Sequence, residues 1–425
     1  MRHRGRHRRR RQGRALRAGL AGTALALTAA ATMISASQAT DADDPGALKP
    51  LTASTETTPL RLTGHDVPGA ALDRLARGMG RPVGVSAVLA DPDGALSDAE
   101  DCTDDDRRAL PVEPSATQAY CWPGEDTDGW RPGAVTTSGD AEEDGRWGAH
   151  RVILSGWSRS SGSAAEQGLA RVAFVNAGDT GEPRYTWALL AVPVDGGRDY
   201  RGLGSTVSGM VWYQDKLLVT TGRGEGGALY VYDLDRVLRA TVEGTPVGRV
   251  PGGWSAAGAR YVLPAVASYR TAGAGAPQPG GISLDRSTAP DSLVAHEAAP
   301  ADEDGPTRLW RYSFGAGPER AGLLEPDPVA VYETELTHVR SVLSYRSGWY
   351  LGRMTGTPDE RGTLWRQDTD GARPTRCGAD ETHRCWSGEA TSLSYWQETG
   401  EVWSQSGRML FALPLTSVDR SLDDD

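Results

Sequence analysis

Five residues of the chain have side chains and positions suited to ligand binding or acid–base chemistry. Asp128, Asp285 and Glu389 carry carboxylates, whereas His338 and Arg340 lie two residues apart and could bind an anionic group. Hydrolysis of a glycosidic bond needs two positioned carboxylates with separated pKa values. Only Asp285 lies within a segment that we expect to be an inner strand. We therefore interpret the five residues as ligand-binding candidates, or as solvated loop residues, and leave catalytic residues unassigned.

The element that must position these residues is clearest at 207–234, VSGMVWYQDKLLVTTGRGEGGALYVYDL. Three runs rich in Val, Leu, Tyr and Thr are separated by Gln-Asp and by a glycine-rich turn, which is a strand signal. Turns this short join antiparallel neighbours, so the segment predicts a β-meander.

The same pattern recurs along the chain and predicts an all-β fold, a five-bladed β-propeller over residues 128–415, with six blades as the alternative. A β-sandwich would not repeat the meander five times. The expected inner strands, whose beginnings would place the candidate residues around a central channel, are Ala134–Ser138, Gly209–Tyr213, Gly281–Asp285, Ser341–Tyr345 and Ser392–Trp396.

The N-terminus has the pattern of a Sec-type signal peptide over residues 1–37. Nine arginines precede an apolar run at 18–34, and small residues follow at 35–39. A basic arm with a membrane span is the alternative, but the run is short and weakly apolar for a span. We therefore expect secretion and no membrane span in the mature protein.

The charge of the chain bears on its partners. The formal net charge is −11, and loss of the nine arginines would leave about −20. An acidic surface disfavours nucleic acid and anionic membranes. We expect an extracellular ligand as the partner and a monomeric protein.

Four cysteines remain after residue 37, which in an exported protein suggests two disulfides. Three connectivities fit the sequence. We favour the local pairs Cys102–Cys121 and Cys377–Cys385. His383 near Cys385 raises a zinc site as the alternative, but no CxxC spacing supports one, so we expect no metal.

Several segments flank the repeats. Residues 38–65 are polar and aperiodic and predict a flexible linker. Residues 66–127 predict an N-terminal segment with a short helix at Val67–Met79 and a strand at Arg81–Ala90. We expect that strand to close the ring by pairing with Arg408–Leu413, the outermost strand of the last blade. Residues 416–425 read as an acidic tail.

Other motifs are weaker. Gly222–Gly227 matches GxGxxG, but a strand rather than a helix follows, so we interpret it as a hairpin turn. Asp140, Glu142 and Asp144 resemble the start of a calcium loop, yet the twelfth position is Arg151 rather than Glu. We expect no cofactor, with a calcium site of another type as the alternative. A G-x-S-x-G nucleophile elbow does not occur.

A resemblance extends over most of residues 120–413. The mature region resembles a family of uncharacterised secreted β-propeller-like proteins from high-GC Gram-positive bacteria, most clearly at 132–157, 208–222, 259–269, 282–297 and 392–404. Relatives usually carry Gln within 132–137, whereas this chain has Gly133. The resemblance implies the fold and transfers no activity.

Together these observations predict a secreted binding protein whose ligand is a glycan, a cell-wall fragment or a peptide. The alternative is an extracellular propeller enzyme, such as a glycan hydrolase or a metal-dependent lactonase. Fold alone does not decide between them.

Overall fold

Antiparallel strands dominate the chain. The computed structural model describes residues 44–162, 169–178, 182–221, 229–272, 275–298, 305–317, 320–354, 360–377 and 383–422. Strands hold 47% of these described residues and helices 15%, so the expected β-rich class is right. Within these ranges every helix is too short or too polar to traverse a lipid bilayer.

Two units divide the chain, residues 1–45 and 46–425, and every element described below belongs to the second. The predicted signal peptide at 1–37, the glycine-rich turn at 222–227 and the last residues, 423–425, lie outside the described ranges.

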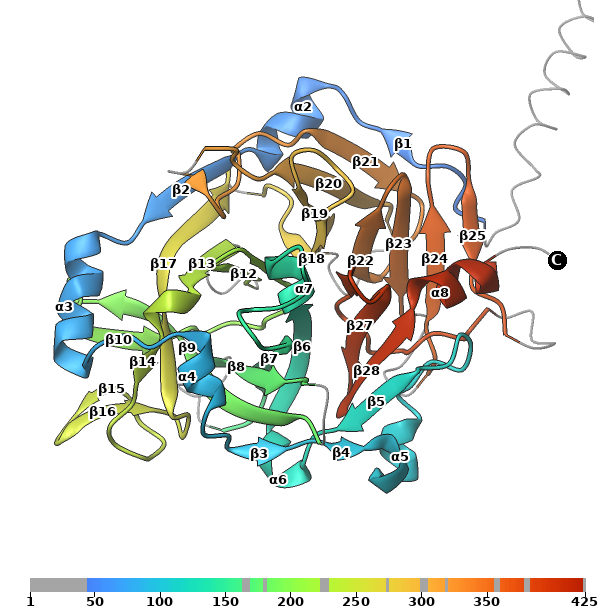
Figure 1. Cartoon of the computed structure of the whole chain (residues 1–425). Helices are drawn as coiled ribbons and strands as arrows, with labels where there is room; N and C mark the ends of the chain where they lie inside the picture. The colour runs from blue at the N-terminus through green and yellow to red at the C-terminus, as the bar shows by residue number, and fades with distance from the viewer. Residues whose placement is uncertain are drawn as a thin grey trace, which may run out of the picture. The chain divides into compact units, whose positions relative to one another are not determined.

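Four-stranded antiparallel meanders form the body of the second unit (Figure 1). The first consists of β6 (Trp130–Thr137), β7 (Val152–Arg159), β8 (Ala170–Asn176) and β9 (Arg184–Val194). The second consists of β11 (Met210–Tyr213), β12 (Lys216–Thr220), β13 (Leu229–Asp233) and β17 (Tyr261–Thr271). The first residues of β17 also pair in parallel with β9, which joins the two meanders into one sheet.

Three further meanders follow along the chain. The third has β18 (Pro279–Asp285), β19 (Ser292–Glu297), β20 (Thr307–Ser313) and β21 (Ala330–Thr334). The fourth has β22 (Val339–Tyr345), β23 (Gly348–Arg353), β24 (Thr363–Gln367) and β25 (Ala372–Pro374). The fifth has β26 (Ser394–Trp396), β27 (Glu401–Ser406), β28 (Met409–Pro414) and, from far upstream, β5 (Gln118–Cys121).

The first strands of these meanders lie next to one another. β6 neighbours β11, β11 neighbours β18, β18 neighbours β22, and β26 neighbours β6. Between β22 and β26, the rings of Tyr345 and Tyr395 lie 4.8 Å apart. Each of the five inner-strand segments expected from the sequence overlaps one of these strands, although β6, β18 and β22 begin earlier than expected.

Apolar side chains fill the space between neighbouring meanders. Since both faces of each sheet are covered, strands such as β7 are buried along nearly their whole length. Each core holds residues of two successive meanders, for example Val152 and Leu217, Val211 and Leu284, Val294 and Trp349, Leu343 and Phe411, and Trp403 and Trp157.

The segment expected to complete the last sheet is different from the one that does. Val85–Leu89 forms the helix α4 rather than a strand, whereas β5 pairs with β28, with Cys121 opposite Met409. Val85, Val88 and Leu89 are spaced i, i+3 and i+4, so a helix turns all three into one apolar core. An N-terminal strand does complete the last sheet, but it lies about thirty residues further along.

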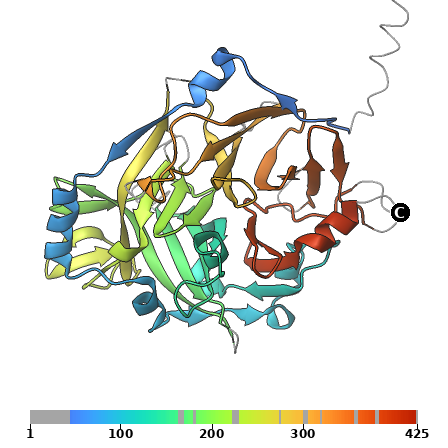
Figure 2. The ribbon, with the colours of Figure 1, turned by 45° about the horizontal axis from the view of Figure 1, so that its top comes forward.

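The predicted flexible linker is ordered over its described second half. β1 (Lys49–Pro50) pairs with β21, and β2 (Leu62–Asp66) pairs with β17. Between them lie α2 (Ser54–Thr57) and η1 (Thr58–Leu60). Leu60 and Leu62 are buried between the second and third meanders, so edge pairing and burial order a segment whose composition is polar. Figures 1 and 2 show this blue segment along the outer strands.

Two longer helices bury apolar side chains against the sheets. The predicted helix at Val67–Met79 is present as α3 (Gly69–Met79), whose Leu75 and Met79 pack against Leu189 and Trp254. The expected acidic tail begins instead as α8 (Leu415–Leu422), which buries Leu415, Val418 and Leu422.

Short elements complete the unit. They are β3 (Gly94–Ala95), β4 (Ser97–Asp98), η2 (Ala99–Asp101), α5 (Asp104–Arg107), α6 (Gly124–Thr127), α7 (Ser138–Ala141), β10 (Asp199–Gly202), η4 (Leu234–Arg236), β14 (Leu238–Arg239), β15 (Val247–Val250) and β16 (Gly253–Ala256).

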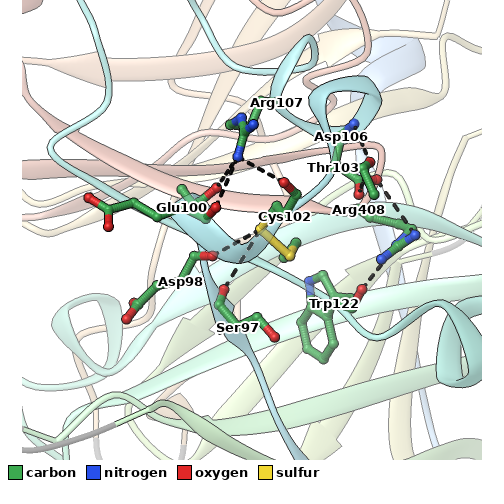
Figure 3. Close-up of a disulfide and its surroundings, with 11 residues drawn as sticks. Ser97, Asp98, Glu100, Cys102, Thr103, Asp106, Arg107, Trp122 and Arg408 are labelled. Atoms are coloured by element: carbon green, nitrogen blue, oxygen red, sulfur yellow. Dashed lines mark hydrogen bonds and ion pairs between the residues drawn. A yellow bond between two sulfur atoms is a disulfide. The ribbon is translucent and has the colours of Figure 1, made fainter.

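Both predicted disulfides are present, Cys102–Cys121 and Cys377–Cys385. Figure 3 shows the first, which ties η2 to the end of the closing strand β5. Arg107 donates to the carbonyl oxygens of Ala99 and Cys102 at 3.0 and 2.8 Å, and Arg408 donates to that of Trp122 at 3.0 Å. The contacts fix this corner of the closing sheet.

Candidate functional site

A cavity of about 320 Å³ opens where several inner strands begin. Its walls come from the start of β6, the end of β7, the segment before β11, the start of β22, the residue after β23 and the loop before β26. The lining residues are Arg131, Pro132, Gly133, Ser158, Thr206, Val207, Ser208, Arg340, Met354, Gly388, Glu389 and Thr391.

Hydrogen bonds hold these walls together. The amide of Val207 donates to the Ser158 hydroxyl at 2.8 Å, which fixes the segment before β11 to β7. The hydroxyl of Thr391 donates to the carbonyl oxygen of Gly133, which fixes the loop before β26 to β6. The cavity is therefore shaped by backbone segments that are bonded to sheets, as a preformed ligand site requires.

Gly133 allows one of these close approaches. The pairing of β6 with β7 is irregular between Pro132 and Ala134, so Gly133 is the extra residue of a bulge. A Cβ placed on it would overlap the carbonyl oxygen of Val207. Position 133 thus has no room for a side chain unless the backbone shifts.

The charged groups at the cavity are two guanidinium groups and one carboxylate, on Arg131, Arg340 and Glu389. All three residues are exposed. Within the described residues, the side chains of Arg131 and Arg340 form neither an ion pair nor a hydrogen bond. The remaining lining is neutral, with hydroxyls of Ser158, Ser208 and Thr391 already engaged in hydrogen bonds.

The structure brings two of the five sequence candidates together. Arg340 and Glu389 line the cavity, whereas His338 lies beside it without lining it. His338 has a left-handed backbone conformation with φ of 56°, its Nδ1 lies 3.2 Å from the Thr337 hydroxyl, and its carbonyl accepts from the amide of Met354.

The other two candidates lie elsewhere. Asp128 is exposed in the turn after α6. Asp285, at the opposite end of β18, is buried and accepts from Arg311 and Ser344, both at 2.7 Å. A carboxylate so fully engaged has a structural role.

Sequence reasoning missed Arg131, Thr206 and Ser208. The signal that could have identified them is the one used for Arg340 and Glu389, namely a polar residue just before an inner strand. Before the first inner strand that signal pointed to Asp128 instead, and β6 begins four residues earlier than expected.

A second polar cluster lies where β6 ends and β26 begins. Asp140 of α7 is fully buried and accepts from the hydroxyls of Thr136 at 2.6 Å and Ser394 at 2.8 Å. Burial raises the pKa of its carboxyl to about 6. Asp140 is also the first residue of the calcium-loop-like sequence. Its carboxyl group thus accepts hydrogen bonds from hydroxyls of the inner strands.

One buried histidine lies directly behind the cavity wall. His296 of β19 packs against Gly281, near the carbonyl oxygen of Arg340. Burial lowers the pKa of its imidazole to about 4. The side chain is therefore neutral at physiological pH and adds no charge behind Arg340.

An acidic cluster on the second meander could offer metal ligands, since oxygens of Asp215, Asp233 and Asp235 lie within 4.8 Å of one another. Lys216 is inserted there, bonded to Asp215 and 3.4 Å from Asp233. Its ammonium already supplies the cation that these carboxylates attract.

The cavity lacks the pair of carboxylates that glycoside hydrolysis uses. Among the described residues that line it, Glu389 carries the one carboxylate. The arrangement of two cations, one anion and neutral hydroxyls is suited to binding a polar ligand.

Comparisons with known proteins assign no family. No family model matches the chain, and no curated protein matches it. Similar solved structures include Drosophila Plexin A in complex with Semaphorin 1b, with 9% identity, a TM-score of 0.22, and coverage of 62% of this chain and 71% of that one. Another is the S527A variant of the AtxE2 isopeptidase with Astexin3-dC4 bound, with 12% identity, a TM-score of 0.19, and coverage of 80% and 53%. Likenesses this low carry no argument about fold or function.

Proposed function

We propose that the protein is a secreted, monomeric five-bladed β-propeller that binds a small extracellular ligand in the cavity at the start of its inner strands. A glycan, a cell-wall fragment and a short peptide are the ligand types considered. The cyclic neighbourhood of β6, β11, β18, β22 and β26 supports the propeller, as do the apolar cores between successive meanders. In a propeller, each blade packs its face on the next around a central channel.

Secretion is supported by the two disulfides, which persist in oxidising compartments, and by the basic, apolar and small-residue pattern of residues 1–37. The acidic composition supports a ligand other than nucleic acid.

The observation that carries the binding proposal is the cavity itself. About 320 Å³ falls within the range of small-ligand sites, and its walls are fixed by hydrogen bonds to the neighbouring strands β6 and β7. The enzyme alternative is weaker, because the single lining carboxylate cannot act as both acid and nucleophile at one glycosidic bond.

A thermal-shift and calorimetric screen against oligosaccharides, cell-wall fragments and peptides tests the proposal, since a ligand that binds the native state raises the melting temperature. Thr206→Trp would place an indole at the cavity rim, and Val329→Trp adds the same side chain at an exposed residue outside the lining. We expect a hit whose binding is lost in Thr206→Trp and kept in Val329→Trp. Absence of hits, or binding that both variants retain, would refute the cavity as the binding site.

A further inference from the structure

Within the described residues, no carboxylate pairs with the two arginines at the cavity, in contrast to two buried or half-buried arginines elsewhere in the chain. Arg260 is held by Asp91 and Asp93, both at 2.5 Å, and Arg311 is held by Asp285 at 2.7 Å. Arg131 and Arg340 have no such partner within the described ranges. The cavity thus has two guanidinium groups and one carboxylate, an excess of positive charge that suits an anionic group of a ligand.

Their positions are set by the sheets. Arg131 lies on β6 opposite Ser158 of β7, and Arg340 lies on β22 at an irregularity between Val339 and Ser341. The backbones that carry the two guanidinium groups are thus fixed before any ligand arrives, which reduces the entropy lost on binding.

We infer that the cavity recognises a ligand through a carboxylate group, an inference that rests on the proposed binding function. Guanidinium groups present paired N–H donors that match the two oxygens of a carboxylate. Glu389 adds one carboxylate to the same cavity.

Two sources supply this chemistry, a sugar acid and the C-terminus of a peptide. D-glucuronate probes the first, with D-glucose as its neutral counterpart. N-acetylalanine probes the second, with N-acetylalaninamide as its neutral counterpart. Titration calorimetry of the full protein with all four compounds separates the carboxylate requirement from the identity of the rest of the ligand.

We expect at least one anionic probe to bind roughly tenfold or more tightly than its neutral counterpart, as a charge-assisted hydrogen bond implies. Arg131→Gln and Arg340→Gln should each lower the affinity for the anionic probe by a similar factor. The affinity for the neutral probe should stay unchanged. Arg81→Gln makes the same charge change at an exposed arginine outside the cavity lining and should leave the affinity unchanged. Circular dichroism and melting temperature check that the variants are folded.

The possible failures are distinguishable. If anionic and neutral probes bind equally and only Thr206→Trp abolishes binding, the carboxylate inference is wrong and the binding function stands. If no probe binds, or if binding survives Thr206→Trp, both the inference and the cavity assignment are overturned. If Arg81→Gln weakens binding of the anionic probe as much as Arg340→Gln does, the net charge of the protein causes the effect. The inference is then again overturned.

Discussion

The hydroxyl of Ser394 donates a hydrogen bond of 2.8 Å to the carboxylate of Asp140, across 254 residues of sequence. Asp140 follows the inner strand of the first meander, and Ser394 begins the inner strand of the last. Thr136 donates to the same carboxylate at 2.6 Å. The two ends of the repeat array are therefore linked by a buried polar contact as well as by the pairing of β5 with β28.

The burial of Asp140 and of His296 predicts two opposed effects of pH on stability. The pKa of Asp140 is raised to about 6, so its contribution to stability is fully present below its usual pKa and is lost as pH rises through about 6. The pKa of His296 is lowered to about 4, so its contribution is present above its usual pKa of 6.5 and is lost as pH falls through about 4. Each amounts to about 3 kcal/mol, and the two oppose each other between pH 4 and 6.5.

Single substitutions should separate the two effects. In Asp140→Asn, the free energy of unfolding should fall by up to about 3 kcal/mol between pH 6.5 and 4, whereas in His296→Gln it should rise by a similar amount. Urea denaturation at several pH values measures both. Asp144→Asn, at an exposed site close to Asp140, is the control. If the free energy of unfolding changed with pH in the same way in the unchanged protein and in all three variants, Asp140 and His296 would not be the groups responsible.

The first disulfide should stabilise ring closure. Cys102–Cys121 closes a separation of 19 residues and ends on β5, whereas Cys377–Cys385 closes 8. The chain-entropy model predicts losses of about 3 and 2.5 kcal/mol for the paired Cys→Ala variants. Because β5 completes the last sheet, the loss of Cys102–Cys121 should lower the single melting transition of the whole unit in calorimetry. A separate early transition confined to the N-terminus would argue against a closing role.

The segment before α3 should contribute to stability, contrary to a flexible linker. Leu60 is fully buried between the second and third meanders, and its carbonyl accepts from Tyr312. Leu60→Ala should reduce the free energy of unfolding by about 2–5 kcal/mol. Thr63→Ala, at an exposed residue on β2, should change it little. Equal stability of the two variants in urea denaturation would show that the segment does not pack in solution.

The buried pair of Arg311 and Asp285 should be asymmetric to mutation. Arg311→Met leaves a buried carboxylate with hydroxyl and amide donors but no cation, and should cost about 3–5 kcal/mol. Asp285→Asn in the same background removes the charge and should recover part of that loss. A double-mutant cycle from denaturation curves measures the coupling, and additive losses would show that the pair is energetically independent.

Gly133 should tolerate no side chain. Gly133→Ala forces Val207 away from β6 and should cost about 1–3 kcal/mol, as overpacking does. Gly69→Ala at the start of α3 meets open space and is the matched control. A neutral Gly133→Ala variant would mean that the two backbones separate freely.

Local patterns were sufficient to predict the inner strands and the disulfide pairs. Runs such as Met210–Tyr213 and Leu229–Asp233 are rich in Val and Tyr and are separated by short turns, so neighbouring strands pair with little choice of register. Cysteines separated by 19 and 8 residues close short loops, which makes the local pairs the easiest to form.

Only the tertiary structure decided the closing strand, the order of residues 46–66 and the composition of the cavity. Val85, Val88 and Leu89 suit a strand or a helix, and the core that receives them selects the helix. Gln118–Cys121 carries little strand signal of its own and becomes a strand because β28 offers an unpaired edge. Arg131, Thr206, Arg340 and Glu389 come from four segments far apart in the chain, and their meeting depends on how the sheets pack. The sequence by itself determined which segments could form strands, because alternation and turn residues act over a few positions, whereas the cavity depends on contacts between segments that no local pattern encodes.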